Sequence, residues 1–131
     1  FFNKKDIKSQ FINFENSMQK LHEIVKRIKY KKNVIYAYGS PTKASLLIIS
    51  SKLNKGYIKN TFEDNSLKCN KYIPGTDIKI LSSKNIKLIK PKYVLVLAWN
   101  FAKEIELKLK SNKKYKISLI IPLPKPKIIE I

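Results

Sequence analysis

The sequence is poor in glycine and cysteine, and each shortage excludes a class of site. Its 131 residues include three glycines, which lie far apart at Gly39, Gly56 and Gly75. This spacing excludes the glycine-rich fingerprints that bind dinucleotides, nucleoside triphosphates or S-adenosylmethionine. Cys69 is the only cysteine. The sequence therefore contains neither an internal disulfide nor a cysteine-based zinc site.

Histidine is equally scarce, and this excludes the catalytic sets that depend on a histidine base. His22 is the single histidine, and it lies in a predicted helix, away from the other polar residues of interest. No Ser-His-Asp or Cys-His set can be built around it. Glu63, Asp64 and Glu104 offer carboxylates, but nothing in the sequence fixes their separation. We therefore predict no catalytic residue and no metal ligand, and we expect the domain to hold a ligand rather than transform one.

Long apolar runs are also absent. None approaches the roughly 20 residues of a membrane span, and the charges that follow Phe1 and Phe2 do not fit a secretory signal. The chain does not begin with Met, so we expect a fragment of a longer polypeptide. The single cysteine fits a reducing compartment. We expect a cytoplasmic protein that makes no contact with a membrane.

Basic residues, by contrast, are abundant. There are 28 of them against 9 acidic residues, which gives a net charge of +19. Such a charge can bind nucleic acid by releasing counterions from phosphates. However, all but one of the basic residues are lysines spread along the chain, as an AT-rich genome would produce, whereas a reader of bases would use arginine. A basic nucleic-acid-binding domain is therefore the alternative hypothesis, and nucleic acid is not the partner we expect.

A long amphipathic helix is predicted over residues 6–30. Its apolar side chains recur at alternating steps of four and three, at Ile7, Phe11, Phe14, Met18, Leu21, Val25 and Ile28. We interpret this stripe as packing on its own domain or on a missing upstream one. We assign residues 1–32 to this helix and residues 33–131 to the domain that follows. A scaffold domain without a ligand is the least specific hypothesis.

Residues 33–131 alternate between short apolar runs and helical segments. Strands are predicted at 34–38, 58–62, 78–80, 93–98, 117–121 and 128–131. One helix is predicted at 42–53, with Ser40 as its N-cap and Pro41 at the first helical position, and another at 100–109, capped by Asn100. This order is typical of a small Rossmann-like α/β domain, in which a mostly parallel sheet of four to six strands has helices on both faces.

Polar residues gather where the predicted strands end, which is where ligands bind in open parallel sheets. The helix start near Lys43 offers N–H groups and a charge to a phosphate, or it is simply a capped helix with an exposed lysine. Glu63 lies 24 positions after Gly39, near the spacing at which an acid binds a ribose hydroxyl, although it also fits a plain turn. Trp99 can stack on a base or belong to the core.

The ten residues from Lys68 to Asp77 form a long cationic connection beside this edge. Lys68 and Lys71 lie in it, and the chain reverses at Pro74 and Gly75, where proline fixes φ and glycine permits a positive φ. Ordered connections of this length commonly serve in binding. The two lysines would neutralise a diphosphate, although solvated lysines are the commoner situation.

Three segments, in order, resemble a known family. Residues 38–43 (YGSPTK), 63–76 (EDNSLKCNKYIPGT) and 93–105 (YVLVLAWNFAKEI) are similar to the C-terminal domain of the S-adenosylmethionine-dependent sugar-nucleotide C-methyltransferases. The resemblance covers residues 34–126. The family's motif residues are found at Tyr38, Gly39, Lys43, Asp64, Lys68, Tyr72, Pro74, Gly75, Thr76, Trp99, Asn100 and Glu104. Three positions depart from the pattern: Ser40 replaces the usual alanine, and Ala44 and Asn70 stand where glycine is common.

The resemblance implies recognition of a nucleotide-linked deoxysugar, usually dTDP-linked, by a Rossmann-like domain that forms one wall of the active-site cleft. Adding Glu63 and Lys71 to the twelve motif residues completes the candidate substrate-binding set. S-adenosylmethionine and zinc are expected in upstream domains and not in this one. The S-adenosylmethionine-binding domain of the same polypeptide is then the expected partner, and the isolated domain is expected not to transfer a methyl group.

Overall fold

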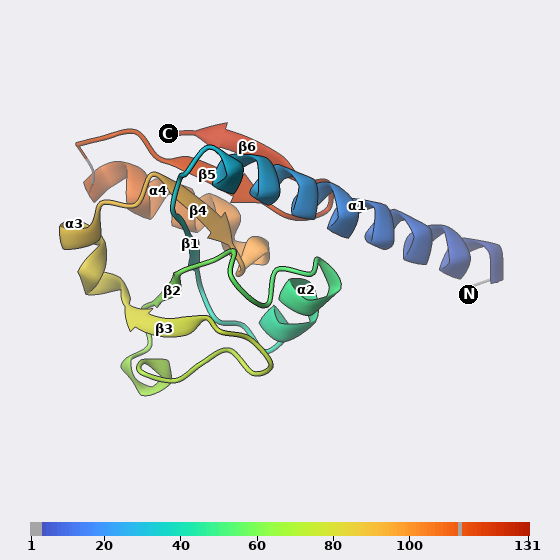
Figure 1. Cartoon of the computed structure of the whole chain (residues 1–131), viewed down its shortest axis with the longest axis horizontal. Helices are drawn as coiled ribbons and strands as arrows, with labels where there is room; N and C mark the ends of the chain where they lie inside the picture. Colours follow the sequence, from blue (N-terminus) through green and yellow to red (C-terminus); the bar gives the residue numbers. More distant parts are fainter. Residues whose placement is uncertain (1–3, 113) are drawn as a thin grey trace.

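The computed structural model describes residues 4–112 and 114–131, and it confirms the predicted α/β class (Figure 1). The first three residues of the segment assigned to the N-terminal helix lie outside the described part. The strands are β1 (Ile35–Tyr38), β2 (Asn60–Glu63), β3 (Lys79–Ser82), β4 (Tyr93–Val96), β5 (Ser118–Ile121) and β6 (Lys127–Glu130). The helices are α1 (Lys4–Tyr30), α2 (Ala44–Ser50), α3 (Ile86–Ile89) and α4 (Ala102–Asn112), with 3-10 turns η1 (Ser66–Lys68), η2 (Ser83–Asn85) and η3 (Trp99–Phe101).

The six strands form one sheet in the order β3-β2-β1-β4-β5-β6. Strands β1 to β5 are parallel, and β6 pairs with β5 in the antiparallel sense. The chain builds the sheet outward from β1 to β3, and it then returns to place β4 on the other side of β1. Connections leave β1 and β4 in opposite directions, so a crevice opens at their carboxyl ends.

Helices cover both faces of the sheet, as the sequence predicts. On one face, Leu21 of α1 and Ile48 of α2 pack with Leu95 of β4 in one apolar cluster. On the other, Ile105 of α4 packs with Val94 of β4, and α3 contributes partly buried side chains. Burial on both faces explains why β4 is a continuous apolar run instead of an alternating one.

Only the second half of the α1 stripe is covered by this domain. From Met18 onward the stripe is buried, whereas Ile7 and Phe11 are 54% and 61% exposed. In Figure 1 the N-terminal half of α1 extends beyond the rest of the molecule. No helix among the described residues is both long and apolar enough to cross a membrane.

Two predicted helix starts are wrong. Helix α2 begins at Ala44, and its N-cap is Lys43, with no capping side chain. Ser40 lies four residues before Ala44, too early to cap the helix, and its hydroxyl donates to the Glu63 carboxylate on the neighbouring strand, at 2.5 Å. Asn100 does not cap α4 either, because it lies in the middle of η3, and α4 follows that turn.

Candidate functional site

Two neighbouring hollows lie at the carboxyl ends of the parallel strands. The strand-end hollow, of about 400 Å³, is lined by Tyr38, Gly39, Ser40, Pro41, Glu63, Asp64, Lys68, Ala98, Phe101, Glu104, Ile105 and Lys108. The loop hollow, of about 360 Å³, is lined by Ser40, Pro41, Thr42, Ala44, Ser45, Lys68, Lys71, Tyr72, Ile73, Pro74 and Ile80. Ser40, Pro41 and Lys68 line both, so they form the ridge between the two hollows.

A larger groove, of about 780 Å³, runs along α1 toward the end of α2. Its lining includes Phe11 and Phe14 but none of the predicted site residues. We place the candidate site at the strand ends because fold topology and the predicted residues coincide there.

Gly39 fixes the junction of three strands at the base of the strand-end hollow. Its φ is +95°, and a Cβ built on it would lie 2.8 Å from the Cβ of Ala98, which follows β4. Its N–H donates to the Phe62 carbonyl at 2.7 Å, and its carbonyl accepts from the Thr61 hydroxyl at 2.6 Å. Only glycine tolerates both this backbone conformation and this close approach. The predicted role of this glycine at a strand end therefore has a clear steric basis.

Glu63, the last residue of β2, holds the ridge through a hydrogen bond with Ser40. One carboxylate oxygen accepts from the Ser40 hydroxyl, and the other accepts from the backbone N–H of Asn65 at 2.9 Å. Both oxygens thus already have a protein donor. Glu63 holds Ser40 in place, which is a positioning role in addition to any contact with a ligand.

Asp64 is the centre of a polar network on the wall of the strand-end hollow. Its Oδ1 accepts from the Tyr38 hydroxyl at 2.9 Å and pairs with the Lys108 ammonium at 2.7 Å. The Lys108 ammonium also lies 5.9 Å from the centre of the Tyr38 ring. Lys108 reaches this wall from α4.

This network shifts the pKa of all three members. Partial burial by itself would raise the pKa of Asp64, but hydrogen bonds from Lys108, Ser83 and Tyr38 outweigh it and hold that pKa below its usual value. Burial, reinforced by Asp64, raises the pKa of Tyr38. For Lys108, burial acts to lower the pKa, but Asp64 and Tyr38 raise it above its usual value. Asp64 and Lys108 are therefore both charged at neutral pH.

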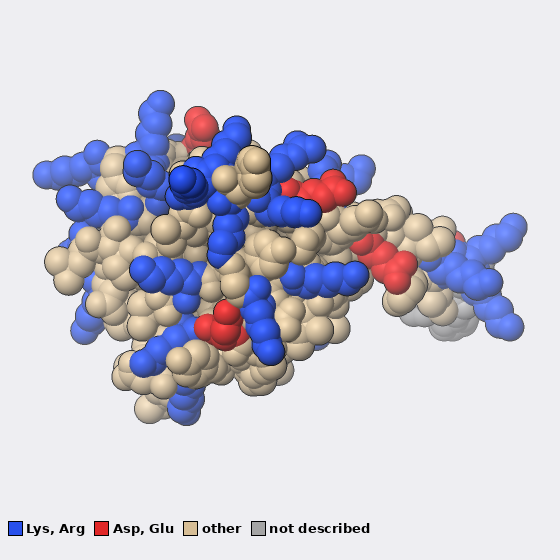
Figure 2. All heavy atoms as spheres, in the orientation of Figure 1, with Lys and Arg blue, Asp and Glu red and all other residues tan. Residues whose placement is uncertain are grey.

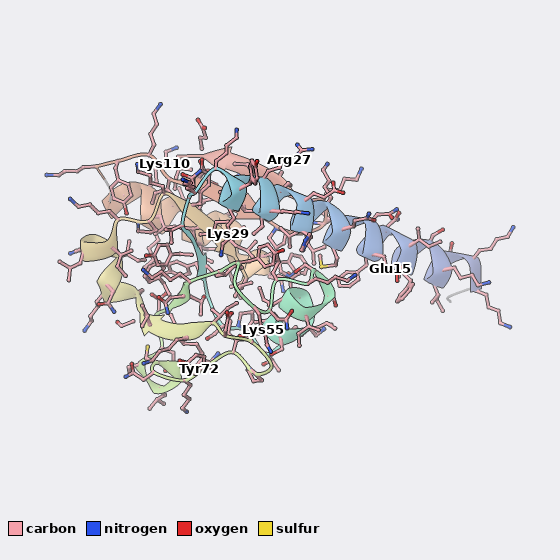
Figure 3. All side chains as sticks on the ribbon, in the orientation of Figure 1. Glu15, Arg27, Lys29, Lys55, Tyr72 and Lys110 are labelled. Atoms are coloured by element: carbon pink, nitrogen blue, oxygen red, sulfur yellow. The ribbon has the colours of Figure 1, made fainter. Side chains whose placement is uncertain are left out.

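Lys68 stands on the ridge and faces both hollows. Its Nζ donates to the Ser40 carbonyl at 3.1 Å, which holds the ammonium over the ridge. Lys71 and Tyr72 follow on the wall of the loop hollow, and Tyr72 is 58% exposed. Figure 3 shows Tyr72 on the connection below β3, at a distance from the projecting half of α1.

The connection from Lys68 to Asp77 also covers the outer edge of β3. The N–H of Asn70 donates to the Ile80 carbonyl at 2.8 Å, and the N–H of Ile80 donates to the Lys71 carbonyl at 2.7 Å. These bonds satisfy backbone groups that an edge strand would otherwise leave open. The connection therefore has a structural role as well as a position beside the crevice.

The reversal of this connection is a β-turn held by its own residues. The Thr76 N–H donates to the Ile73 carbonyl at 3.1 Å, and Gly75 has a φ of +76°, as a turn with proline second and glycine third requires. The Thr76 hydroxyl donates to the same carbonyl at 2.8 Å, and the Ser45 hydroxyl donates to the Pro74 carbonyl at 2.9 Å. Gly75 and Thr76 thus shape the turn, and the bond from Ser45 to Pro74 anchors it to α2.

The structure separates the fourteen candidate residues into two groups. Nine line at least one hollow: Tyr38, Gly39, Glu63, Asp64, Lys68, Lys71, Tyr72, Pro74 and Glu104. Five line neither: Lys43, Gly75, Thr76, Trp99 and Asn100. Lys108, Phe101 and the ridge residue Pro41 line the hollows without having been predicted.

The charges of the two hollows differ. Three carboxylates (Glu63, Asp64 and Glu104) line the strand-end hollow beside Lys68 and Lys108, whereas the loop hollow has Lys68 and Lys71 and no acid. Within the described part of the chain, no group of three or more His, Cys, Asp or Glu residues is placed to hold a metal ion. The arrangement suits a ligand that carries hydroxyl groups at one end and phosphates at the other.

Comparison with known proteins places this geometry in a wider context. A family model described as the C-methyltransferase C-terminal domain matches residues 4–124, which include the whole of α1. The C-methyltransferase NovU of Streptomyces niveus is 31% identical to the chain over 115 residues. That alignment covers 88% of this chain and 27% of NovU. The chain thus spans little more than a quarter of the length of this relative.

Proposed function

The chain belongs to the family of C-methyltransferase C-terminal domains, and from this premise we propose that it is the substrate-recognition domain of an S-adenosylmethionine-dependent C-methyltransferase. Its ligand in this proposal is a nucleotide-linked sugar. The methyl donor and the catalytic groups belong to the rest of such an enzyme, so this domain forms one wall of the reaction cleft. The observation that carries the proposal is the separation of charge across the Ser40–Pro41 ridge.

The loop hollow suits the diphosphate of such a ligand. Lys68 and Lys71 supply two positive charges, and no carboxylate lines this hollow to oppose them. Lys68 is already held over the ridge by the Ser40 carbonyl, so little side-chain freedom is lost when a phosphate binds. The exposed ring of Tyr72 lies on the same wall and offers a stacking surface for a base.

The strand-end hollow suits the sugar. Glu104 lines it and is exposed, and its side chain makes no hydrogen bond or ion pair with the other described residues. Its carboxylate is therefore available to accept from sugar hydroxyl groups, whereas Glu63 and Asp64 are already engaged by the protein. Phe101 and Ile105 add apolar surface for the deoxygenated part of a deoxysugar.

Calorimetric titration with dTDP and with a dTDP-linked deoxysugar tests this proposal. We expect saturable binding, weakened about tenfold or more by Lys68→Ala, because each charge-assisted bond to phosphate contributes about 1.5–3 kcal/mol. Lys20→Ala, which removes an exposed lysine from α1, is the matched control and should leave the affinity unchanged. Absence of heat at millimolar ligand, or equal effects of the two substitutions, would overturn the assignment.

A further inference from the structure

Lysines of four separate connections meet at the amino-terminal edge of the sheet. We call this surface the amino edge, and it consists of residues 29–34, 55–59, 90–92 and 114–117, which precede β1, β2, β4 and β5. These 18 residues contain nine lysines and no acidic residue. The lysines are Lys29, Lys31, Lys32, Lys55, Lys59, Lys90, Lys92, Lys114 and Lys116, and all nine are exposed.

The carboxyl edge has a different composition. Its connections, residues 39–43, 63–71, 83–85, 97–104 and 122–126, contain six lysines and three acidic residues among 30 residues. A genome-wide bias toward lysine would enrich both edges alike. The excess at the amino edge therefore needs an explanation of its own.

Sheet order turns these connections into a row. The strands they precede are neighbours in the order β2-β1-β4-β5, and Ile35 pairs with Tyr93, which pairs with Ser118, so the starts of β1, β4 and β5 are level. With strands about 4.8 Å apart, the row is about 14 Å long. Asp77 precedes β3 and Glu130 ends β6, so these two acidic residues lie at the ends of the row, and the Asp77 carboxylate accepts from the Gly56 N–H at 2.8 Å.

Neighbouring connections also make direct contact. Lys29 at the end of α1 and Lys59 before β2 line a common hollow of about 340 Å³, together with Tyr57 and the acidic Asp77. The Lys29 ammonium lies 5.7 Å from the centre of the Tyr57 ring. Lys29 and Lys55 are labelled in Figure 3, and Figure 2 shows basic side chains spread over the visible face with few acidic ones among them.

We propose that the amino edge binds a single-stranded nucleic acid without preference for its base sequence. This surface lies at the opposite ends of the strands from the sugar-nucleotide site. A linear row of lysines fits a chain of phosphates better than a plane of lipid headgroups. Tyr30 is 89% exposed and stands between Lys29 and Lys31, where its ring can stack on a base. Lysine without arginine supplies charge but no base readout.

Fluorescence anisotropy with a labelled single-stranded DNA of about 20 nucleotides tests this surface, since compact domains cover about 4–16 nucleotides. Contact with about four phosphates predicts a slope near −3 in a plot of log affinity against log salt. The test variant replaces one lysine of each connection by alanine: Lys31, Lys59, Lys92 and Lys116. The control variant replaces four exposed lysines elsewhere, with the same change in net charge: Lys8, Lys20, Lys84 and Lys125.

We expect the test variant to bind at least tenfold more weakly with a flatter salt slope, and the control variant to change by no more than about twofold. Equal weakening in both variants would show that net charge alone drives binding, and it would overturn the proposal. So would a flat salt response of the unmodified chain, or tighter binding to phosphatidylserine vesicles than to DNA. Circular dichroism of both variants establishes that they are folded.

Discussion

Gly39 illustrates how a single residue determines the geometry of the strand-end hollow. Its positive φ and the 2.8 Å approach to Ala98 make two separate demands that only glycine meets. Only the backbone requirement applies at Gly56, which has a φ of +79° but no atom within 4 Å of an added Cβ. The two positions therefore separate backbone strain from steric conflict.

We predict that Gly39→Ala lowers the free energy of unfolding by about 2–4 kcal/mol, because strain and overpacking add. Gly56→Ala should cost about 1 kcal/mol, the strain alone. Urea unfolding of both variants measures the difference. Equal losses of stability would show that the contact with Ala98 relaxes without cost.

The Asp64 network makes stability depend on pH. Because the folded-state pKa of Asp64 is below its unfolded value, its ion pair with Lys108 contributes above that unfolded value and is lost as pH falls through the folded one. The raised pKa of Lys108 acts at the other end, so that contribution is lost only as pH rises beyond the lysine's usual range.

We therefore predict that Asp64→Asn flattens the loss of stability below about pH 4, near the unfolded pKa of aspartate. The effect should be less than about 1 kcal/mol, because both charged groups are about half exposed. Denaturant unfolding at several pH values measures it, with Glu23→Gln on α1 as the control. An unchanged acid limb in Asp64→Asn would contradict the role of this carboxylate.

At the scale of elements, lysine takes the left-handed position that follows a helix, where glycine is the usual residue. Lys52 has a φ of +57° after α2. Its N–H donates to Ile49 and that of Leu53 donates to Ile48, which is the Schellman pattern of a helix end. Lys32 after α1 and Lys90 after α3 also have a positive φ, of +63° and +52°.

Replacing Lys52 by glycine should raise the free energy of unfolding by about 1 kcal/mol, since it removes left-handed strain. Lys20→Gly, in the interior of α1, should lower it by about the same amount. Thermal unfolding of both variants is the measurement. A loss of stability in Lys52→Gly would mean that the lysine side chain compensates for its own backbone strain.

Elements that bury a regular apolar pattern could be predicted from the sequence. The stripe of α1 and the continuous run of β4 are examples, because each repeats the period of its own secondary structure. Helix α3 spans four residues, which is shorter than periodicity can resolve, and it was not predicted. The starts of α2 and α4 were misplaced because the Ser40 hydroxyl bonds to Glu63, which is distant in sequence, and because a 3-10 turn at Asn100 precedes α4.

In the candidate site, too, residues placed by the local sequence pattern could be predicted, and residues placed by distant contacts could not. Gly39, Glu63 and Lys68 could be placed at the crevice because each follows a strand or lies in the connection beside it. Lys108 could not, since it is one of three exposed lysines on α4 and only the folded chain brings it to Asp64. Gly75 and Thr76 carry family motif positions, yet in the structure they hold a turn.

At the scale of the whole molecule, the sheet presents two edges with different characters. The carboxyl edge has a mixture of acids and lysines around two hollows, and the amino edge has a row of lysines. This separation follows from the parallel arrangement of β1 to β5, which places the starts of these strands on one side and their ends on the other. A ligand at one edge therefore need not interfere with a ligand at the other.

The central claim is that a nucleotide-linked sugar binds across the Ser40–Pro41 ridge, and amide chemical-shift mapping of the labelled chain during titration with a dTDP-linked deoxysugar tests it most directly. We predict saturable shifts at residues 38–41, 63–68, 71–74 and 98–108, and none along the projecting half of α1. Shifts confined to the groove beside Phe11 and Phe14, or an unchanged spectrum at millimolar ligand, would contradict the claim.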